Sequence, residues 1–231
     1  MPTLVYSVPQ LGDQKGPTCW YYVTKMLLKF HGLLDNNPEE WQQLKEVRKV
    51  ITALAASKGK YDDAETIKSQ LMQGNAAAQA AASKLRTTSR YDILGQFFGS
   101  YFKPVSLSDY SAQGLYKLLE ANGPLYSSTY GTGLGYDYVK DPANAQQWVY
   151  RITGESDHSR GLHAIAIIGV HENDIYYRNP NMFHRDTVES WEILKGQLNT
   201  PKGTEGVNPA LFLKVDCTAG KGECPHLKNL R

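Results

Sequence analysis

One cysteine of this chain stands far from the other two, and its surroundings suit a nucleophile. Cys19 lies nearly the whole chain away from Cys217 and Cys224. Apolar residues recur at helical spacing over residues 19–30, and Thr18 is a candidate N-cap for the helix that they predict. Cys19 then falls in the first turn, where the helix dipole and unpaired N–H groups stabilise an anion. A thiol attacks carbonyl groups as its thiolate, so this position favours a catalytic thiol.

A base and a group to orient it are supplied by two neighbouring predicted strands. His163 opens the aliphatic run HAIAIIGV, and a polar turn at 172–174 separates this run from IYYRNP, in which Asn179 follows the last strand residue. Two apolar runs joined by a short polar turn predict a β-hairpin. The start of one strand lies beside the end of its antiparallel partner, so the hairpin brings His163 and Asn179 together. Such a pair provides a general base whose ring is held by an amide oxygen.

An amide side chain on the loop before the predicted helix completes the candidate site. Gln14 lies five residues before Cys19. Together with the backbone N–H of Cys19, its side-chain N–H can form an oxyanion hole for a tetrahedral intermediate. We therefore expect Cys19 as nucleophile, His163 as base, Asn179 as the orienting residue and Gln14 as the oxyanion donor.

Each of these assignments has an alternative that the residues leave open. Gln10 and Asp13 are substitutes for Gln14, and His158, in SDHSRGLH, is the rival base. A cysteine on an amphipathic helix is often a small core residue. In the same way, the histidine can be a strand-edge residue, the Asn-Pro pair a turn signal and the glutamine a solvated loop residue.

The segments that carry these residues resemble those of papain-like cysteine proteases. QKGPTCWYYVTKMLL is similar to their active-site helix, where Gln precedes a Cys-Trp pair, and HAIAIIGV followed by YYRNPN is similar to their His strand and Asn/Asp-Pro turn. GLYKLLEANGPLYSS resembles the helix-Gly-Pro-strand of the bacterial branch. That branch includes double-glycine bacteriocin-processing peptidases and avirulence effector proteases of plant pathogens. The resemblance spans residues 5–30 and 106–195.

Two positions depart from the pattern of that family. The interval from Gln14 to Cys19 is one residue shorter than usual, which puts Gln14 in more doubt than Cys19. The third member of the set is Asn179, where the bacterial branch commonly has Asp. An Asn side chain still accepts a hydrogen bond from imidazole, so the departure does not exclude catalysis.

The order of predicted elements indicates an α+β fold. Residues 38–103 have helical patterns, whereas strand patterns dominate after residue 106, at 125–130, 149–152, the hairpin and 211–215. Ser108 is a candidate cap for a helix that ends at Asn122-Gly123, and the turn-rich stretch that follows residue 130 predicts an irregular loop. We expect one papain-like catalytic domain over 1–231, in which a helical part carrying Cys19 packs on a C-terminal antiparallel sheet. Residues 38–103 form a helical insertion or subdomain, and 216–231 form a C-terminal tail.

Composition and charge restrict the partners of this chain of 231 residues. It is 41% hydrophobic and 21% charged with a formal net charge of +2, and it has no basic block, which argues against a nucleic-acid binder. No run of about 18 apolar residues predicts membrane insertion. No secretory signal is visible at the N-terminus. Cys217 and Cys224 can form a local disulfide or remain reduced.

The resemblance implies a cysteine peptidase that needs no cofactor and cleaves a protein substrate, with a Gly-Gly site as the analogy suggests. It also implies a bacterial effector or toxin, secreted into a target-cell cytoplasm and paired with a cognate immunity protein. A cytoplasmic enzyme is the alternative location. Two other functions stay open, namely a glutamine deamidase or transglutaminase-like enzyme with the same triad, and an inactive papain-like module that binds peptides.

Overall fold

The computed structural model describes residues 2–86, 90–130, 135–154, 162–182, 185–198 and 211–217, without the side chains of 90–92 and 211. His158, Cys224 and the tail from residue 218 onward lie outside the described residues. No helix in these ranges is long and apolar enough to cross a membrane.

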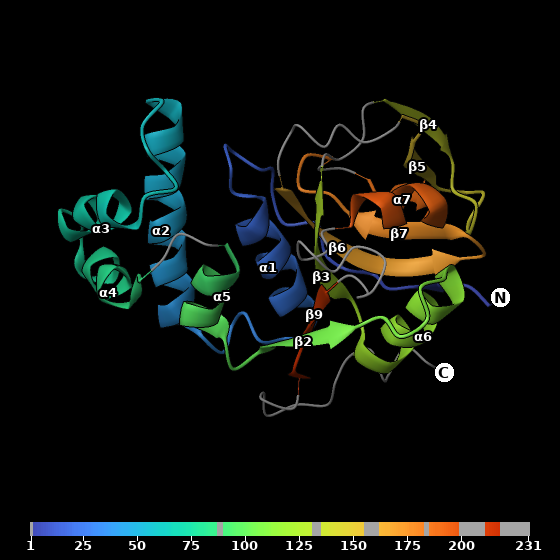
Figure 1. The fold of residues 1–231 in the computed structure, drawn as a ribbon, viewed down its shortest axis with the longest axis horizontal. Helices are drawn as coiled ribbons and strands as arrows, with labels where there is room; N and C mark the ends of the chain where they lie inside the picture. Colours follow the sequence, from blue (N-terminus) through green and yellow to red (C-terminus); the bar gives the residue numbers. More distant parts are fainter. Residues whose placement is uncertain are drawn as a thin grey trace.

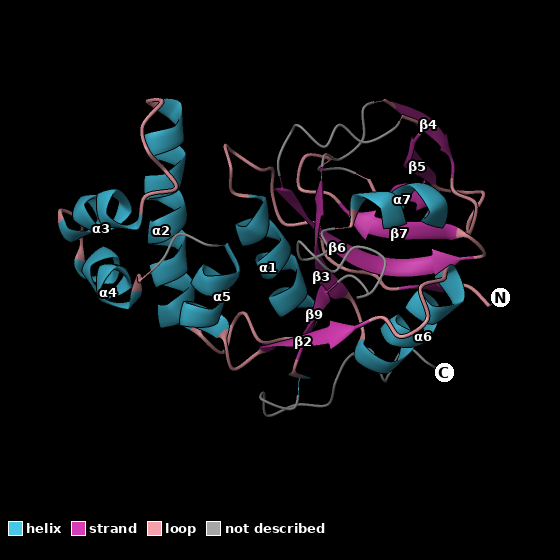
Figure 2. Ribbon diagram, viewed as in Figure 1, coloured by secondary structure: helices cyan, strands magenta, loops and turns pink. Residues whose placement is uncertain are grey.

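Helices and one large sheet make up an α+β architecture (Figures 1 and 2). The helices are α1 Cys19–Phe30, α2 Pro38–Ala56, α3 Ala64–Met72, α4 Ala76–Lys84, α5 Arg90–Phe98, α6 Ala112–Asn122 and α7 Trp191–Gln197. The strands are β1 Leu4–Val5, β2 Phe102–Ser106, β3 Leu125–Tyr130, β4 Tyr136–Lys140, β5 Trp148–Ile152, β6 Leu162–His171, β7 Asp174–Arg178, β8 Thr187–Ser190 and β9 Leu211–Val215.

Helix α1 lies between a group of helices and the sheet (Figure 1). On one side, α2 packs against α3, α4 and α5, the four helices of the region that the sequence predicts as helical. On the other side, α1 packs on β6 and β3. Buried side chains from both sides belong to one connected hydrophobic cluster. The helical region thus packs onto the same core as the sheet. The last two residues of the predicted helical region 38–103 belong instead to strand β2.

The sheet has the strand order β2-β9-β3-β6-β7-β8-β5-β4, and β1 pairs separately with β6. Most neighbouring strands are antiparallel, but β5 and β8 run parallel. The prediction of a purely antiparallel sheet is therefore wrong at this pair. Strand β5 joins the sheet by pairing with β8. The two strands are separated in the chain by β6 and β7, and a connection of this length allows parallel pairing, which a short hairpin turn does not.

The central hairpin of β6 and β7 is the part of the sheet that the sequence indicates best. Its register places Ile167 opposite Tyr177 and His171 opposite Asp174, with a shift in pairing between Ile167 and Gly169. Strand β1 pairs with β6 at Gly169 and lies so close that a Cβ on this residue would be 2.3 Å from the carbonyl oxygen of Leu4. Glycine at this position lets β6 pair with β1 as well as with β3 and β7.

Two local expectations are wrong. Helix α6 is capped by Ser111, whose side chain accepts from the Gly114 N–H, and not by Ser108. The stretch predicted as an irregular loop contains β4, because Tyr136 and Tyr138 alternate with polar residues and pair with β5. Its turn residues, Asp141 and Asn144, instead shape the connection between the two strands.

Candidate active site

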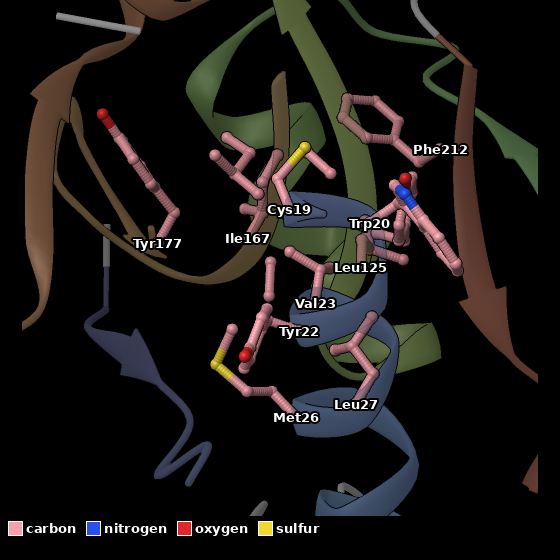
Figure 3. Close-up of a cluster of buried hydrophobic side chains, with 14 of the residues drawn as sticks. Cys19, Trp20, Tyr22, Val23, Met26, Leu27, Leu125, Ile167, Tyr177 and Phe212 are labelled. Carbon is pink, nitrogen blue, oxygen red and sulfur yellow. The ribbon is translucent and has the colours of Figure 1, made fainter. Parts of the chain in front are cut away.

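Cys19 is the first residue of α1 and is buried, with 2% of its surface exposed. Figure 3 shows its side chain beside Ile167 of β6, in a buried cluster that also contains Tyr177 of β7 and Leu125 of β3. Its thiol is not in a disulfide. The nucleophile predicted from the sequence therefore lies where the start of α1 meets the centre of the sheet.

The first turn of α1 favours negative charge on a side chain at this position. Helix α1 has no acidic residue in its first turn and has Lys29 in its last turn. The first N–H groups of a helix have no partner within the helix, and they carry the positive end of its dipole. Thr18 is the N-cap residue by position, but its side chain does not cap the helix, because its hydroxyl donates to the Lys15 carbonyl at 2.7 Å. This threonine stabilises the preceding loop instead.

His163 and Asn179 are joined by a buried hydrogen bond of 2.9 Å between Nε2 of the ring and Oδ1 of the amide. The backbone N–H of Asn181 donates to the same Oδ1 at 2.9 Å. Because a backbone N–H can only donate, this contact identifies Oδ1 as the amide oxygen and Nε2 as the protonated nitrogen. Nδ1 is then the nitrogen of His163 that can exchange a proton with a thiol.

The pair lies on the sheet face that α1 covers. Ile167, which lies beside Cys19 in Figure 3, is directly opposite Tyr177 across β6 and β7. Side chains two or four positions apart in a strand point to the same face. His163 is four positions before Ile167 and Asn179 is two after Tyr177, so both share the face that packs on α1.

The loop before α1 is attached to the turn after β7. The backbone N–H of Gln14 donates to the Pro180 carbonyl at 3.2 Å, next to Asn179 in the chain. Gly16 in this loop has a φ of +63°, which suits glycine and lets the chain turn into α1. This contact places Gln14, five residues before Cys19, beside the turn that follows Asn179.

The side chain of Gln14 is held within its own loop. Its Nε2 donates to the Gly16 carbonyl at 2.7 Å, and its Oε1 is buried with no hydrogen-bond partner among the residues that the structure describes. Nε2 has a second N–H that this bond does not use. Gln10 has a buried amide whose oxygen and nitrogen have no hydrogen-bond partner in the described part of the chain, whereas Asp13 is exposed. Gln10 thus remains a second candidate donor near the start of the helix.

A buried polar network joins β7, β8 and α7, and the sequence does not predict it. Glu189 of β8 is fully buried and accepts from the Tyr177 hydroxyl at 3.1 Å and from Gln197 Nε2 at 2.6 Å. Burial raises the pKa of Glu189 to about 7, and the two hydrogen bonds oppose part of that rise. Burial and the neighbouring Glu189 raise the pKa of Tyr177 well above its usual value. The glutamate in the short run TVES would indicate such a network only if the run were known to be a buried strand, and the sequence does not show that.

The residue before Asn179, Arg178, forms an ion pair and a backbone contact. Arg178 Nη1 lies 2.6 Å from Asp186 Oδ1, and Arg178 Nε donates to the Val8 carbonyl at 3.0 Å. Burial raises the pKa of Asp186, while the Arg178 guanidinium opposes this rise. Arg178 therefore ties the end of β7 both to the N-terminal segment and to the loop before β8.

The other predicted features are only partly described. Cys217 is in a disulfide, and the partner that the sequence indicates, Cys224, lies outside the described residues. In the part of the chain that the structure describes, no three His, Cys, Asp or Glu residues are grouped so that they could hold a metal ion.

Comparison with known proteins finds similarity to solved structures. No protein-family model matches the chain, and no curated protein matches it. The fold is similar to a crystal structure of a candidate C39-like peptidase from Bacillus anthracis, with a TM-score of 0.46 and 13% sequence identity. The match covers 94% of this chain and 98% of the other. With so low a score, the functional assignment depends on the geometry of the site itself.

Proposed function

We propose that this chain is a papain-like cysteine peptidase in which Cys19, His163 and Asn179 form the catalytic set. The observation that carries the proposal is the bond between His163 Nε2 and Asn179 Oδ1, on the sheet face covered by the helix that begins with Cys19. A core cysteine does not require a buried histidine held in one tautomer on the same face. A thiol nucleophile does require such a base.

The first half of the reaction transfers an acyl group to the enzyme. His163 accepts the Cys19 proton at Nδ1, and the thiolate attacks the carbonyl carbon of the scissile peptide bond. The tetrahedral intermediate places negative charge on the carbonyl oxygen, which the backbone N–H of Cys19 and the amide of Gln14 would stabilise. As this intermediate collapses, the C–N bond breaks, His163 returns the proton to the leaving amine, and a thioester remains on Cys19.

The second half hydrolyses the thioester. His163 removes a proton from water, the resulting hydroxide attacks the thioester carbonyl, and the C–S bond breaks. The carboxylic acid leaves and Cys19 recovers its thiol proton through His163. Asn179 accepts from Nε2 throughout, so the ring keeps Nδ1 directed at the reacting atoms. Each step uses only this chain, the substrate and water.

The biological setting follows from the sequence resemblance and belongs to the same proposal. A bacterial effector or toxin that cleaves a protein in the cytoplasm of a target cell fits the similarity to effector proteases. Cleavage after a Gly-Gly pair fits the similarity to double-glycine peptidases. A producer cell would then need an immunity protein that binds this chain. Co-expression of the toxin with neighbouring genes tests this point, since only a true immunity protein restores growth.

A peptide library made from whole-proteome digests tests the activity. We expect wild-type protein to produce new N-termini at a restricted set of sites, and Cys19→Ala to lower their rate of formation by at least about 10⁴-fold. Conversion of glutamine to glutamate without new termini would identify a deamidase. Retention of peptides without chemical change would identify a binding module. Either of these two outcomes contradicts the peptidase proposal.

A further inference from the structure

The hairpin of β4 and β5 presents an exposed aromatic surface at one edge of the sheet. Tyr138 lies opposite Tyr150 and Lys140 opposite Trp148, so these side chains share one face of the hairpin. The rings of Tyr138 and Trp148 are stacked with centroids 5.0 Å apart and an interplanar angle of 16°. We define the aromatic face as Tyr136, Tyr138, Trp148 and Tyr150. Tyr136, Tyr138 and Trp148 are 53%, 46% and 39% exposed, which is unusual for rings of this size.

Two cations are held on the aromatic face. Lys140 Nζ lies 4.5 Å from the centroid of the Trp148 ring, and the Arg185 guanidinium lies 5.6 Å from that of Tyr138. Such contacts keep the charged groups on the rings. The acidic residues nearest in the chain have other partners or another direction. Asp141, directly after Lys140, is buried and accepts from the Tyr176 hydroxyl at 2.6 Å. Asp137 points to the opposite face of β4, and Asp186 pairs with Arg178. The described charges on this face are therefore positive.

Strand β4 is also a terminal strand of the sheet. Within the described ranges it pairs only with β5, so one row of its backbone N–H and C=O groups has no strand beside it. Such an edge can accept an extended peptide as a further strand, with alternate side chains of the peptide over the aromatic face. The five residues of β4 match a peptide segment about 17 Å long.

The hairpin is connected to the candidate active site. β3 ends at Tyr130, which pairs with Leu162, the residue before His163. The chain between these two residues contains the β4–β5 hairpin. Behind the hairpin, the Tyr150 N–H donates to the Asp186 carbonyl at 3.0 Å, and Asp186 pairs with Arg178 beside Asn179. A peptide on β4 would therefore be attached to the same rigid elements that hold the catalytic pair.

We propose that β4 and the aromatic face bind an extended acidic segment of the protein substrate as an additional strand, away from the scissile bond. This inference deepens the proposed peptidase function and rests on it for the identity of the occupant. The cations select carboxylates, the rings contact the aliphatic parts of the peptide, and the edge of β4 supplies backbone hydrogen bonds. Cleavage-site selection would then depend on sequence outside the residues that flank the bond.

Binding is tested with a fluorescein-labelled peptide of alternating glutamate and threonine, about eight residues long, so that one face of the strand carries all the carboxylates. Its affinity is measured by fluorescence anisotropy on Cys19→Ala protein, which cannot cleave it through the proposed mechanism. Two comparison peptides replace glutamate by lysine or carry N-methyl groups on alternate backbone nitrogens. We expect both to bind at least about tenfold more weakly, because one loses the charge match and the other loses backbone donors.

Variants of the surface complete the test. Lys140→Glu combined with Arg185→Glu, and separately Trp148→Ala, should each weaken binding of the acidic peptide by at least about tenfold. Lys103→Glu is the matched control, because Lys103 is exposed on β2, the strand at the opposite end of the sheet order. These surface variants all replace exposed residues. Circular dichroism checks that each of them remains folded.

Several other outcomes overturn the inference. Equal binding of the acidic, basic and N-methylated peptides excludes an added acidic strand. Sedimentation that shows a dimer lost in Trp148→Ala assigns the surface to a second copy of the chain. A Trp148 fluorescence response to a chito-oligosaccharide but not to the peptide assigns it to a sugar. Peptide binding without library cleavage would contradict the peptidase and leave the peptide-binding surface, whereas cleavage without peptide binding would contradict only the surface.

Discussion

His163 Nε2 and Asn179 Oδ1 are 2.9 Å apart across the β6–β7 hairpin, and the same oxygen accepts from the backbone of Asn181. The amide oxygen of Asn179 thus holds the ring and the turn that follows it at once. Because the turn fixes the amide, the amide fixes the ring, and Nδ1 of His163 is left for proton exchange.

Replacement of Asn179 tests this orienting role. Asn179→Ala removes the acceptor that orients the base. A positioned base contributes about 10²–10⁴-fold to the rate, so we expect kcat to fall by as much as this factor, with a small change in KM. Asn179→Asp keeps an acceptor for both donors and should retain most of the activity. The measurement is steady-state kinetics on a peptide found in the library. Equal losses in the two variants would mean that the amide acts only as a general structural residue.

The reactivity of Cys19 tests its pairing with His163. A helix N-terminus and an imidazolium stabilise a thiolate, so iodoacetamide should alkylate Cys19 in folded protein well below pH of about 8.5, the usual thiol pKa. His163→Ala should shift the pH midpoint of alkylation upward. Intact mass followed by peptide mapping identifies the modified cysteine. Alkylation that occurs only after unfolding would show that Cys19 is an inert core residue.

The amide of Gln14 is tested against that of Gln10. If Gln14 donates to the oxyanion, Gln14→Ala should lower kcat by about 10²–10³-fold, while Gln10→Ala has a much smaller effect. The reverse order would assign the oxyanion donor to Gln10, whose buried amide has no partner within the described ranges. Thermal unfolding of both variants separates a loss of catalysis from a loss of the Gln14–Gly16 contact.

Glu189 predicts a pH dependence of stability. Its pKa is raised from 4.5 to about 7 in the folded protein, so between these values the folded state holds the proton more tightly than the unfolded state. The free energy of unfolding should therefore fall as pH rises through this window and level off above about pH 7. At about 1.4 kcal/mol per unit, the total is about 2–4 kcal/mol.

Glu189→Gln removes this titration, and its amide oxygen can still accept from Gln197 while its amide N–H donates to the Tyr177 hydroxyl, which can accept as well as donate. Urea unfolding should show the variant more stable than wild type at about pH 8, with the difference shrinking toward about pH 4.5. Glu192→Gln, an exposed change on α7, is the matched control and should show no such trend. A stability difference independent of pH would contradict the raised pKa.

The local elements of the site could be predicted from the sequence because their signals are local. The apolar spacing from Cys19 onward and the two runs around the 172–174 turn predict α1 and the β6–β7 hairpin, and a hairpin fixes its own register. The catalytic roles of Cys19, His163, Asn179 and Gln14 are still predictions.

The remaining features depend on contacts between distant segments. β8 and β5 pair in parallel although the hairpin of β6 and β7 separates them in the chain, and no short-range pattern encodes that pairing. The same is true of the Gln14–Pro180 bond and of the Arg178 contact with Val8. The sequence predicts a loop at β4 because glycines precede this strand and polar residues alternate within it, as expected for an exposed edge strand.

The central claim is that Cys19 forms a covalent acyl intermediate during peptide hydrolysis. The most direct measurement is rapid-quench intact mass spectrometry of the protein mixed with a peptide identified from the library. We expect a transient adduct on Cys19 whose added mass is that of the free N-terminal fragment less one water, formed more slowly in His163→Ala and absent in Cys19→Ala. Hydrolysis of the same peptide by Cys19→Ala at the wild-type rate, or turnover with no adduct on Cys19 under single-turnover conditions, would contradict the claim.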